Sequence, residues 1–361
     1  MLLPSTPPLS LLLIFFIHNL PPYMAARPAP EFASNQLTET TPSNYYYYYY
    51  YYYYHNRFLN SRRGSHVSGL SEIKKYFHYF GYLTSQDYDV SDDMFDAPLE
   101  SAVIYYQSKL GLQVTGKLDF DTLSQILAPR CGVPDAGSSP ALHATKNYVY
   151  FPGKPRWARR IPMTLTYGFS PDYMIRYLSL SDIRKTFKGA FSKWESVIPV
   201  RFVETDDYGF ADIKIGFYAG DHGDGEPFDG VLGILGHSFS PESGKLHLDA
   251  AETWAVDFQV EKSKVAIDLE SVAVHEIGHL LGLAHSPVKG AVMYPSLKPR
   301  VKKVDLSLDD IQGVQSLYGT NPNFTFSSSL ESDTSANPAV GSRFEPSLWA
   351  MSMLLAACFC I

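Results

Sequence analysis

The stretch that decides the fold reads His275-Glu276-Ile277-Gly278-His279-Leu280-Leu281-Gly282-Leu283-Ala284-His285. On a helix, His275 and His279 lie one turn apart on the same face, so their two imidazoles can bind one metal ion. Gly282 can adopt the left-handed conformation that ends a helix, which lets the chain turn back and bring His285 to the same ion. Three neutral histidines around Zn²⁺ leave one coordination position for water, which is typical of a catalytic zinc site.

Glu276 follows the first of these histidines and is placed to take a proton from the water on the metal. Zinc lowers the pKa of its water from about 15.7 to about 7, so a hydroxide-like nucleophile exists at neutral pH. Short His-Glu-x-x-His patterns also arise by chance in helices, and the spacing to Gly282 and His285 is what makes this one specific. Ordinary hydrogen bonds can satisfy a buried histidine, but three histidines and a glutamate are costly to bury without a cation.

The composition narrows the class of protein. The chain has 361 residues, of which 45% are hydrophobic, and its formal net charge is −7. This length allows roughly two ordinary domains with packed cores. The acidic balance argues against a nucleic-acid-binding protein, which usually needs a basic face. Three cysteines, two of them in the last four residues, cannot form a disulfide framework.

The N-terminal segment predicts export from the cell. Residues 1–26 are expected to be a secretory signal peptide, because Leu9–Ile17 has the length of its apolar region and Ala25-Ala26 offers a cleavage site. The alternative is an uncleaved membrane anchor. Residues 27–66 are expected to be a low-complexity, flexible arm, because the tyrosine run Tyr45–Tyr54 has no periodicity from which to build a one-sided core.

The C-terminal segment predicts a lipid anchor. A polar linker (320–346) precedes a hydrophobic tail (347–361), and together they form the signal for a GPI anchor. If this signal is used, Cys358 and Cys360 are removed with the tail. The alternative is an unprocessed tail. The linker contains a glycosylation sequon at Asn323.

Residues 67–135 are expected to form a three-helix domain. Apolar residues recur at helical spacing in Leu70–Phe80, in Leu99–Leu110 and in Asp119–Leu127. The segment Pro129–Asp135 that follows is rich in proline and glycine, which predicts a stiff, extended and exposed linker with a cysteine in its middle.

Residues 136–319 are expected to form one α+β domain. The expected strands alternate apolar and polar residues, and the expected helices carry an apolar stripe. In chain order these elements are a strand at Met163–Phe169, a helix capped by Ser181, strands at Val200–Val203 and Ile213–Phe217, and helices at 268–281 and 308–318.

Two further motifs carry a family resemblance. Ala291-Val292-Met293-Tyr294-Pro295 is similar to the Met-turn of the matrix metalloproteinases, and Pro129–Asp135 is similar to their cysteine switch. With the histidine motif, Leu70–Gly319 resembles a matrixin of the metzincin clan, and its layout is similar to that of plant-type members without a haemopexin domain. The resemblance implies a metzincin-like α+β catalytic domain, with a twisted mixed sheet and three helices, after a small three-helix prodomain. It also implies a secreted zinc endopeptidase made as a zymogen, with Met293 as a hydrophobic floor beneath the zinc.

Cys131 is the residue that the resemblance assigns to inhibition, because its thiolate would fill the fourth position on the zinc. A thiolate is a strong ligand for Zn²⁺ and displaces the water that hydrolysis requires. Arg130 would favour the thiolate, and Asp135 could pair with that arginine. The alternative is an unpaired surface thiol.

By the same resemblance, the segment between Gly220 and Trp254 holds two more ions. A structural zinc with four protein ligands would be bound by His222, Asp224, His237 and His247. Calcium would be bound by the carboxylates of Asp229, Asp249 and Glu252 and the carbonyls of Gly230, Leu232 and Ile234. The alternative is an acidic, glycine-rich surface loop. Lys245 stands where many family members carry an aspartate, so a second calcium site is not implied.

The resemblance also implies how substrates bind. The strand Leu232–Gly236 is similar to the family's edge strand, which pairs with an extended peptide or protein substrate through backbone hydrogen bonds. Pro295–Leu297 would form the opposite wall, and the pocket between them would take an apolar side chain just after the scissile bond. The loop 298–305 would set the depth of this pocket. We expect a monomer.

Activation would require a second protease that cuts between Asp135 and about Leu165. Three arginines in this stretch, Arg156, Arg159 and Arg160, are either its target or ordinary surface charge.

Two other functions fit parts of the sequence. The three-helix segment resembles a peptidoglycan-binding module, so the chain could be an extracellular polysaccharide binder with an inactive protease fold. The intact Glu276 and three histidines argue against this, because a binder needs no general base. The second alternative keeps the protease and drops the GPI anchor.

Overall fold

A computed structural model describes residues 43–84, 92–135 and 148–325 of the chain. Contacts divide the chain into two compact units, Met1–Phe324 and Thr325–Ile361, and the elements below all belong to the first. Among the described residues, no helix has the length and apolar character that crossing a membrane requires. The predicted signal peptide and GPI tail lie outside the described residues.

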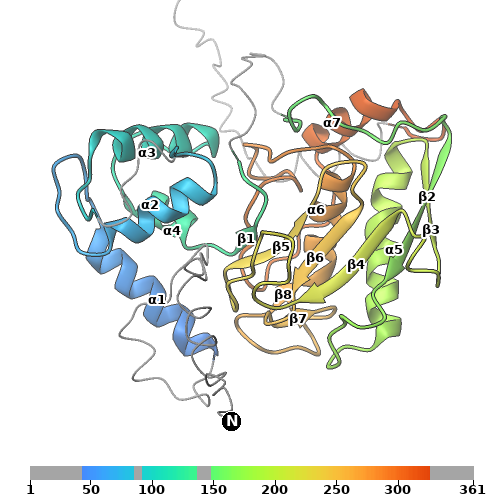
Figure 1. The fold of residues 1–361 in the computed structure, drawn as a ribbon, viewed down its shortest axis with the longest axis horizontal. Helices are drawn as coiled ribbons and strands as arrows, with labels where there is room; N and C mark the ends of the chain where they lie inside the picture. The colour runs from blue at the N-terminus through green and yellow to red at the C-terminus, as the bar shows by residue number, and fades with distance from the viewer. Residues whose placement is uncertain (1–42, 85–91, 136–147, 326–361) are drawn as a thin grey trace, which may run out of the picture. The chain divides into compact units, whose positions relative to one another are not determined.

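The N-terminal part of this unit is helical (Figure 1). Its helices are α1 (Ser43–Phe58), α2 (Leu70–Tyr79), α3 (Ala97–Lys109) and α4 (Phe120–Ile126). The last three are the helices expected from the apolar spacing. Asp96 and Asp119 cap α3 and α4, because each carboxylate accepts a hydrogen bond from a backbone N–H in the first turn. The apolar faces of the four helices meet in one buried cluster.

Helix α1 corrects the expectation of an arm without a core. Tyr54 and Phe58 are buried in the cluster, and His55 Nε2 lies 3.2 Å from Ser124 Oγ of α4. The homopolymer ends at Tyr54, so the residues after it differ from one another. One face can then become apolar, because Tyr54 and Phe58 are four residues apart and lie on the same side of the helix. The prediction of a flexible arm was therefore wrong for the last turns of α1.

The second part is built on a six-stranded sheet with the strand order β1-β5-β6-β4-β2-β3. These strands are β1 (Arg130–Cys131), β2 (Met163–Phe169), β3 (Val200–Glu204), β4 (Ile213–Tyr218), β5 (Ile234–Ser238) and β6 (Lys245–Asp249). Only the β5–β6 pair is antiparallel, so the sheet is mixed, as expected. Two short strands, β7 (Trp254–Ala255) and β8 (Ile267–Asp268), pair separately. Strand β1 comes from the predicted cysteine-switch segment. The expectation that this segment is exposed was wrong, because pairing with β5 buries Arg130, Cys131 and Val133.

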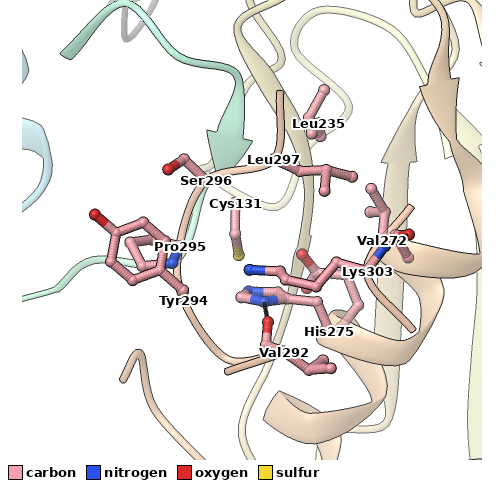
Figure 2. Close-up of a pocket in the computed structure, with 12 residues that line it drawn as sticks. Cys131, Leu235, Val272, His275, Val292, Tyr294, Pro295, Ser296, Leu297 and Lys303 are labelled. Atoms are coloured by element: carbon pink, nitrogen blue, oxygen red, sulfur yellow. Dashed lines mark hydrogen bonds between the residues drawn. The ribbon is translucent and has the colours of Figure 1, made fainter. Parts of the chain in front are cut away.

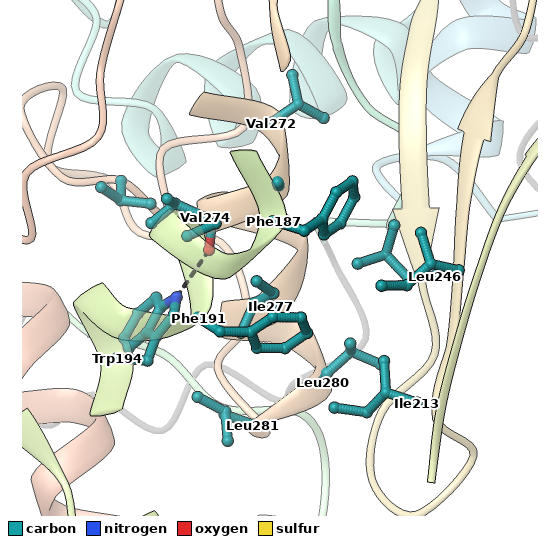
Figure 3. Close-up of a cluster of buried hydrophobic side chains, with 14 of the residues drawn as sticks. Phe187, Phe191, Trp194, Ile213, Leu246, Val272, Val274, Ile277, Leu280 and Leu281 are labelled. Carbon is teal, nitrogen blue, oxygen red and sulfur yellow. Dashed lines mark hydrogen bonds between the residues drawn. The ribbon is translucent and has the colours of Figure 1, made fainter. Parts of the chain in front are cut away.

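Three helices complete this part: α5 (Leu180–Val197), α6 (Leu269–Leu280) and α7 (Leu308–Tyr318). Figure 3 shows Phe187, Phe191 and Trp194 of α5 packed with residues of α6 and of the sheet. The indole Nε1–H of Trp194 donates to the carbonyl of Val274 at 2.9 Å, which ties α5 to α6 inside this core. The α+β fold expected from the sequence is therefore confirmed.

The start of α5 differs from the expected one. Ser179, not Ser181, is the N-cap, because its hydroxyl accepts from the backbone N–H of Asp182. Both serines precede the same apolar stripe, and the geometry of the chain entering the helix selects the first of them.

Candidate active site

The three histidines of the long motif converge. His285 Nε2 lies 3.3 Å from His275 Nε2 and 3.2 Å from His279 Nε2, and Cys131 Sγ lies 3.4 Å from His279 Nε2. The four ligand atoms all lie within 4.8 Å of one another, and all four residues are buried. The motif thus forms one cluster, and the thiol of Cys131, in strand β1, reaches it.

The hydrogen bonds of these rings fit a cation. His275 Nδ1 lies 2.7 Å from the carbonyl of Val292, and His279 Nδ1 lies 2.7 Å from the carbonyl of Leu283. Carbonyl oxygens can only accept, so each Nδ1 carries the proton and each Nε2 presents a lone pair. His285 Nδ1 faces a carboxylate oxygen in the same way. Three lone pairs that point at one another repel without a cation, and neutral imidazole nitrogens are the ligands that zinc prefers.

Local geometry of the chain explains this convergence. Asp268 caps α6, and the helix ends just before Gly282, which has φ +101°. Leu283 N–H donates back to the carbonyl of Gly278 at 3.0 Å, so the chain reverses and carries His285 to the helix face. A Cβ at Gly282 would collide with the carbonyl oxygen of Pro155, so glycine is required for space as well as conformation.

Met293 lies beneath this helix. A Cβ at Gly278 would overlap the sulfur of Met293, so the two residues are in direct contact. The buried carboxylate of Asp310 accepts from the N–H groups of Val292 and Met293 at 2.9 and 3.0 Å. Helix α7 therefore holds the Met-turn in place under the histidine cluster.

Burial sets the protonation of the site. It lowers the pKa of His275 and of His279 well below the usual range, so both rings are neutral. Glu276 is fully buried, which raises its pKa to about 7, while Cys131 and Ser238 beside it work in the opposite direction. A carboxylate with a pKa near neutrality suits a group that takes and returns a proton.

The pKa of the Cys131 thiol differs from the expectation that Arg130 would favour the thiolate. Burial and the neighbouring Glu276 raise its pKa, and Arg130 lowers it by less. Arg130 thus acts in the expected direction but is outweighed. A cation among the three histidines reverses this balance, because a coordinating thiol loses its proton.

Arg130 and Asp135 form a buried ion pair, with Nη2 and Oδ1 2.7 Å apart. The guanidinium also lies 3.6 Å above the ring centroid of Phe80. The hydroxyl of Tyr82 donates to the other carboxylate oxygen of Asp135 at 2.8 Å. Both charges therefore have partners inside the protein. The ion pair links two residues near opposite ends of Pro129–Asp135, which is called the cysteine segment below.

The cysteine segment lies between the two expected walls of the substrate site. On one side Arg130 N–H donates to Gly233 and Gly132 N–H donates to Gly236, at 3.0 and 2.8 Å. On the other side Cys131 N–H donates to the carbonyl of Pro295 at 2.9 Å. Figure 2 shows Cys131 beside the chain that carries Tyr294–Leu297. In this form β1 therefore occupies the edge of β5 that was expected to bind the substrate.

Sequence reasoning missed two contributors to this site. Gln125 of α4 donates to Ser296 Oγ at 2.6 Å and accepts from the hydroxyl of Tyr294 at 3.0 Å. Lys303 lines a pocket of about 20 Å³ beside His275 and Glu276, enough for about one water molecule. Burial lowers the pKa of Lys303 to about 8. The loop 298–305, which contains Lys303, was expected from the sequence to belong to the substrate pocket. No feature of the sequence indicated a role for Gln125.

The second histidine cluster also assembles. Asp224 Oδ2 lies 2.8 Å from His222 Nε2, 2.9 Å from His237 Nε2 and 2.7 Å from His247 Nδ1. These four ligand atoms also lie within 4.8 Å of one another. Burial raises the pKa of Asp224, but hydrogen bonds from His237 and from the backbone N–H of Glu226, together with the nearby histidines, lower it more, so the carboxylate is charged. One anion facing three imidazoles is a donor set that fits a closed zinc site.

The three carboxylates expected at calcium do not form a third such group among the described residues. They are nonetheless near enough to interact: burial and then Asp249 raise the pKa of Glu252 well above its usual range, and burial raises that of Asp249 to about 6, with Asp229 adding to it. Glu252 Oε2 is buried without a hydrogen-bond partner. Crowded, buried acids of this kind are stabilised by a bound cation.

The stretch expected to contain the activation cut, between Asp135 and about Leu165, is described only in part. Residues 136–147 lie outside the described residues. The chain from Tyr148 onward contacts α7, since the hydroxyl of Tyr150 donates to the carbonyl of Gly313 at 2.8 Å. Arg156 donates to the carbonyl of Leu317, and Arg159 pairs with Asp212. These contacts favour the interpretation of Arg156 and Arg159 as structural and surface charge.

Comparison with known proteins gives matches to both parts of the chain. The matrixin family profile matches residues 156–319, and that of a putative peptidoglycan binding domain matches residues 67–126. Metalloendoproteinase 4-MMP of Arabidopsis thaliana is 60% identical over 295 residues, which cover 80% of this chain and 85% of the relative. Metalloendoproteinase 1-MMP of the same plant is 55% identical over 293 residues, covering 80% and 79%. Human matrix metalloproteinase-20 is 42% identical over 217 residues, covering 59% and 41%.

Proposed function

Because this chain belongs to the matrixin family of zinc metalloendopeptidases, we propose that it is a secreted enzyme made as a cysteine-switch zymogen, with Glu276 as its general base. The observation that carries this proposal is the set of three Nε2 lone pairs that face one another beside Glu276 and the Cys131 thiol.

The residues divide the chemistry among them. His275, His279 and His285 would hold the zinc, which when bound acidifies water and polarises the scissile carbonyl. Glu276, with its pKa near 7, accepts the proton of the attacking water and later delivers it to the leaving amine. An extended substrate pairs with the edge of β5 once the cysteine segment has left.

Removal of one carboxylate tests this proposal. Glu276→Ala and Glu276→Gln should bind zinc normally and lose peptide cleavage by at least about a hundredfold, the usual contribution of a general base. The matched control is Glu270→Ala, which removes a more exposed carboxylate from the same helix. Unchanged cleavage in both Glu276 variants contradicts the proposed mechanism.

The same variants address the polysaccharide-binder alternative, which the match of residues 67–126 keeps open. A binder would retain its function when Glu276 is replaced, whereas a protease would not. Retained binding of a cell-wall polysaccharide with no peptide cleavage by the unaltered protein would favour the binder.

For activation, we place the cut between Asp135 and Tyr148. Support comes from the contacts of the residues that follow, which pack against the catalytic part from Tyr148 onward. N-terminal sequencing of the activated enzyme locates the cut, and a first residue after Tyr148 contradicts this placement.

A structural zinc at His222, Asp224, His237 and His247 and a calcium ion at Asp229, Asp249 and Glu252 belong to the same proposal. Gly230, Leu232 and Ile234 would add carbonyl ligands to the calcium ion. The charged Asp224 and the crowded acids support the two sites. Metal analysis should find two zinc ions per chain, and calcium should raise the melting temperature. Asp249→Asn should weaken the calcium effect.

We also propose that the enzyme is exported and anchored at the cell surface. The predicted signal peptide and GPI signal support a cell-surface location, and Asn323 is exposed, as a glycosylation site must be. Phospholipase C treatment of intact cells should release the protein. If none is released, the enzyme is a soluble protease or is held in another way.

A further inference from the structure

Lys303 is a charged residue in a pocket whose other lining is mainly apolar. The pocket lies beside Glu276 and His275 and is walled by Leu235, Val272 and Leu297. Figure 2 shows the Lys303 side chain among these residues. The proposed mechanism gives this ammonium group no role.

The backbone holds Lys303 at this position. Its N–H donates to Ser271 Oγ at 2.7 Å, and the Ser271 hydroxyl donates to the N-cap Asp268 at 2.6 Å. The start of α6 therefore positions the residue at the pocket wall. The neighbouring Lys302 turns the other way, because it is exposed and its Nζ lies 2.7 Å from Glu270.

The Lys303 ammonium has little compensation. Its Nζ lies 5.4 Å from the centroid of the Tyr294 ring, and the charge of Asp310 only partly offsets its burial. Within the described ranges, no carboxylate forms an ion pair with it. A half-buried cation in apolar surroundings is stabilised when an oxygen acceptor enters the same space. A second cation there is repelled.

We propose that Lys303 determines which substrate residue follows the scissile bond, by favouring side chains that end in a carboxylate or amide oxygen and rejecting lysine and arginine. This inference rests on the proposed peptidase function and deepens it. To admit a substrate side chain, the pocket has to widen beyond its present volume of about 20 Å³ once the cysteine segment has left. The aliphatic stem of Lys303 keeps that wall mainly apolar, so unbranched apolar side chains are accepted as well. The expected apolar preference is thereby extended to glutamate and glutamine.

The test compares peptides that differ only in the residue after the scissile bond: methionine, glutamine, glutamate, glutamate methyl ester or lysine. The full chain is activated by removal of the prodomain, and kcat/KM is measured for each peptide. The unaltered enzyme should cleave the glutamate peptide at least about as well as its methyl ester and the lysine peptide about tenfold more slowly than the methionine peptide.

Two variants and one control separate the charge from the shape of Lys303. Lys303→Met keeps the length and removes the charge, so the glutamate-to-methionine ratio should fall about tenfold. Lys303→Arg should keep most of that ratio. Lys302→Met, at the adjacent exposed lysine, should leave it unchanged.

The outcomes distinguish the two proposals. If all peptides are cleaved and Lys303→Met has the same ratio as the unaltered enzyme, the role of Lys303 is overturned and the peptidase function stands. If Lys303→Met does not fold, the unaltered enzyme decides: a methyl ester cleaved faster than free glutamate overturns the inference. If the unaltered enzyme cleaves no peptide, both proposals fall.

Discussion

His285 Nδ1 and Asp135 Oδ1 lie 2.7 Å apart, although the two residues are separated by 150 positions in the chain. The same oxygen accepts from Arg130 at 2.7 Å. One carboxylate of the cysteine segment therefore does two things: it neutralises a buried guanidinium, and it orients the third histidine of the metal cluster. A carboxylate that accepts from a ligating histidine fixes the ring and its tautomer.

The first prediction concerns this carboxylate. Asp135→Asn leaves the Arg130 charge buried without its anion, which costs about 3 kcal/mol or more. The segment should then open more often, so Cys131 of the full-length zymogen should react with a thiol reagent at least about a hundredfold faster. The control is Asp121→Asn, an exposed carboxylate of α4. Equal reaction rates in the two variants would show that the ion pair does not hold the segment.

The second prediction concerns Gln125, which bridges α4 to Ser296 and Tyr294. Gln125→Ala removes two hydrogen bonds, and each typically contributes about 1 kcal/mol. Cys131 should become at least about tenfold more reactive, while the activated enzyme should be unaffected because α4 has left it. Gln113→Ala, at an exposed glutamine, provides the control. A slower activated enzyme would place Gln125 in some other role.

The third prediction concerns the end of α6. Gly282→Ala puts a Cβ against the carbonyl oxygen of Pro155 at a residue with φ +101°. The free energy of unfolding, measured with urea, should fall by about 3 kcal/mol. Zinc affinity should fall too, because His285 follows three residues later and depends on the chain reversal at Gly282. Gly290→Ala is the matched control, since nothing lies within 4 Å of its added Cβ. Similar stabilities of the two variants would contradict the packing at Gly282.

The fourth prediction concerns pH and the cap of α4. Burial opposes ionisation of Asp119, but hydrogen bonds from Thr115 and Thr122 outweigh it and lower its pKa below 3.8. A carboxylate with a depressed pKa stabilises the fold above its unfolded pKa, and this contribution is lost as the pH falls through the folded value. Asp119→Ala should therefore cost about 1 kcal/mol at pH 6 and progressively less below pH 3.8.

This fourth effect is measured as a difference between two proteins, because acid also changes the charge of other groups that both proteins share. Urea unfolding of the unaltered chain and of Asp119→Ala is compared at each pH. The control Asp121→Ala removes an exposed carboxylate from the same helix. A difference that stays constant down to pH 2.5 would show that the Asp119 charge is not what caps α4.

Much of the fold followed from local patterns. The strand Met163–Phe169 and the helix Leu308–Tyr318 begin and end where the apolar spacing placed them. The cap of α5 was two residues off, since Ser179 and Ser181 are equivalent to a pattern and differ only in backbone geometry. Helix α1 was missed because a tyrosine run has no period, and its burial depends on α4.

By itself, the sequence determined the metal chemistry: His275, Glu276 and His279 share one helical turn, and Gly282 allows the reversal to His285. Those relationships are local, so backbone geometry and ligand chemistry suffice to predict them. Only the tertiary structure decided that Asp135 binds His285, that β1 covers the edge of β5, and that Lys303 enters the pocket. Contacts of this kind join segments far apart in the chain, and their geometry depends on how whole elements pack.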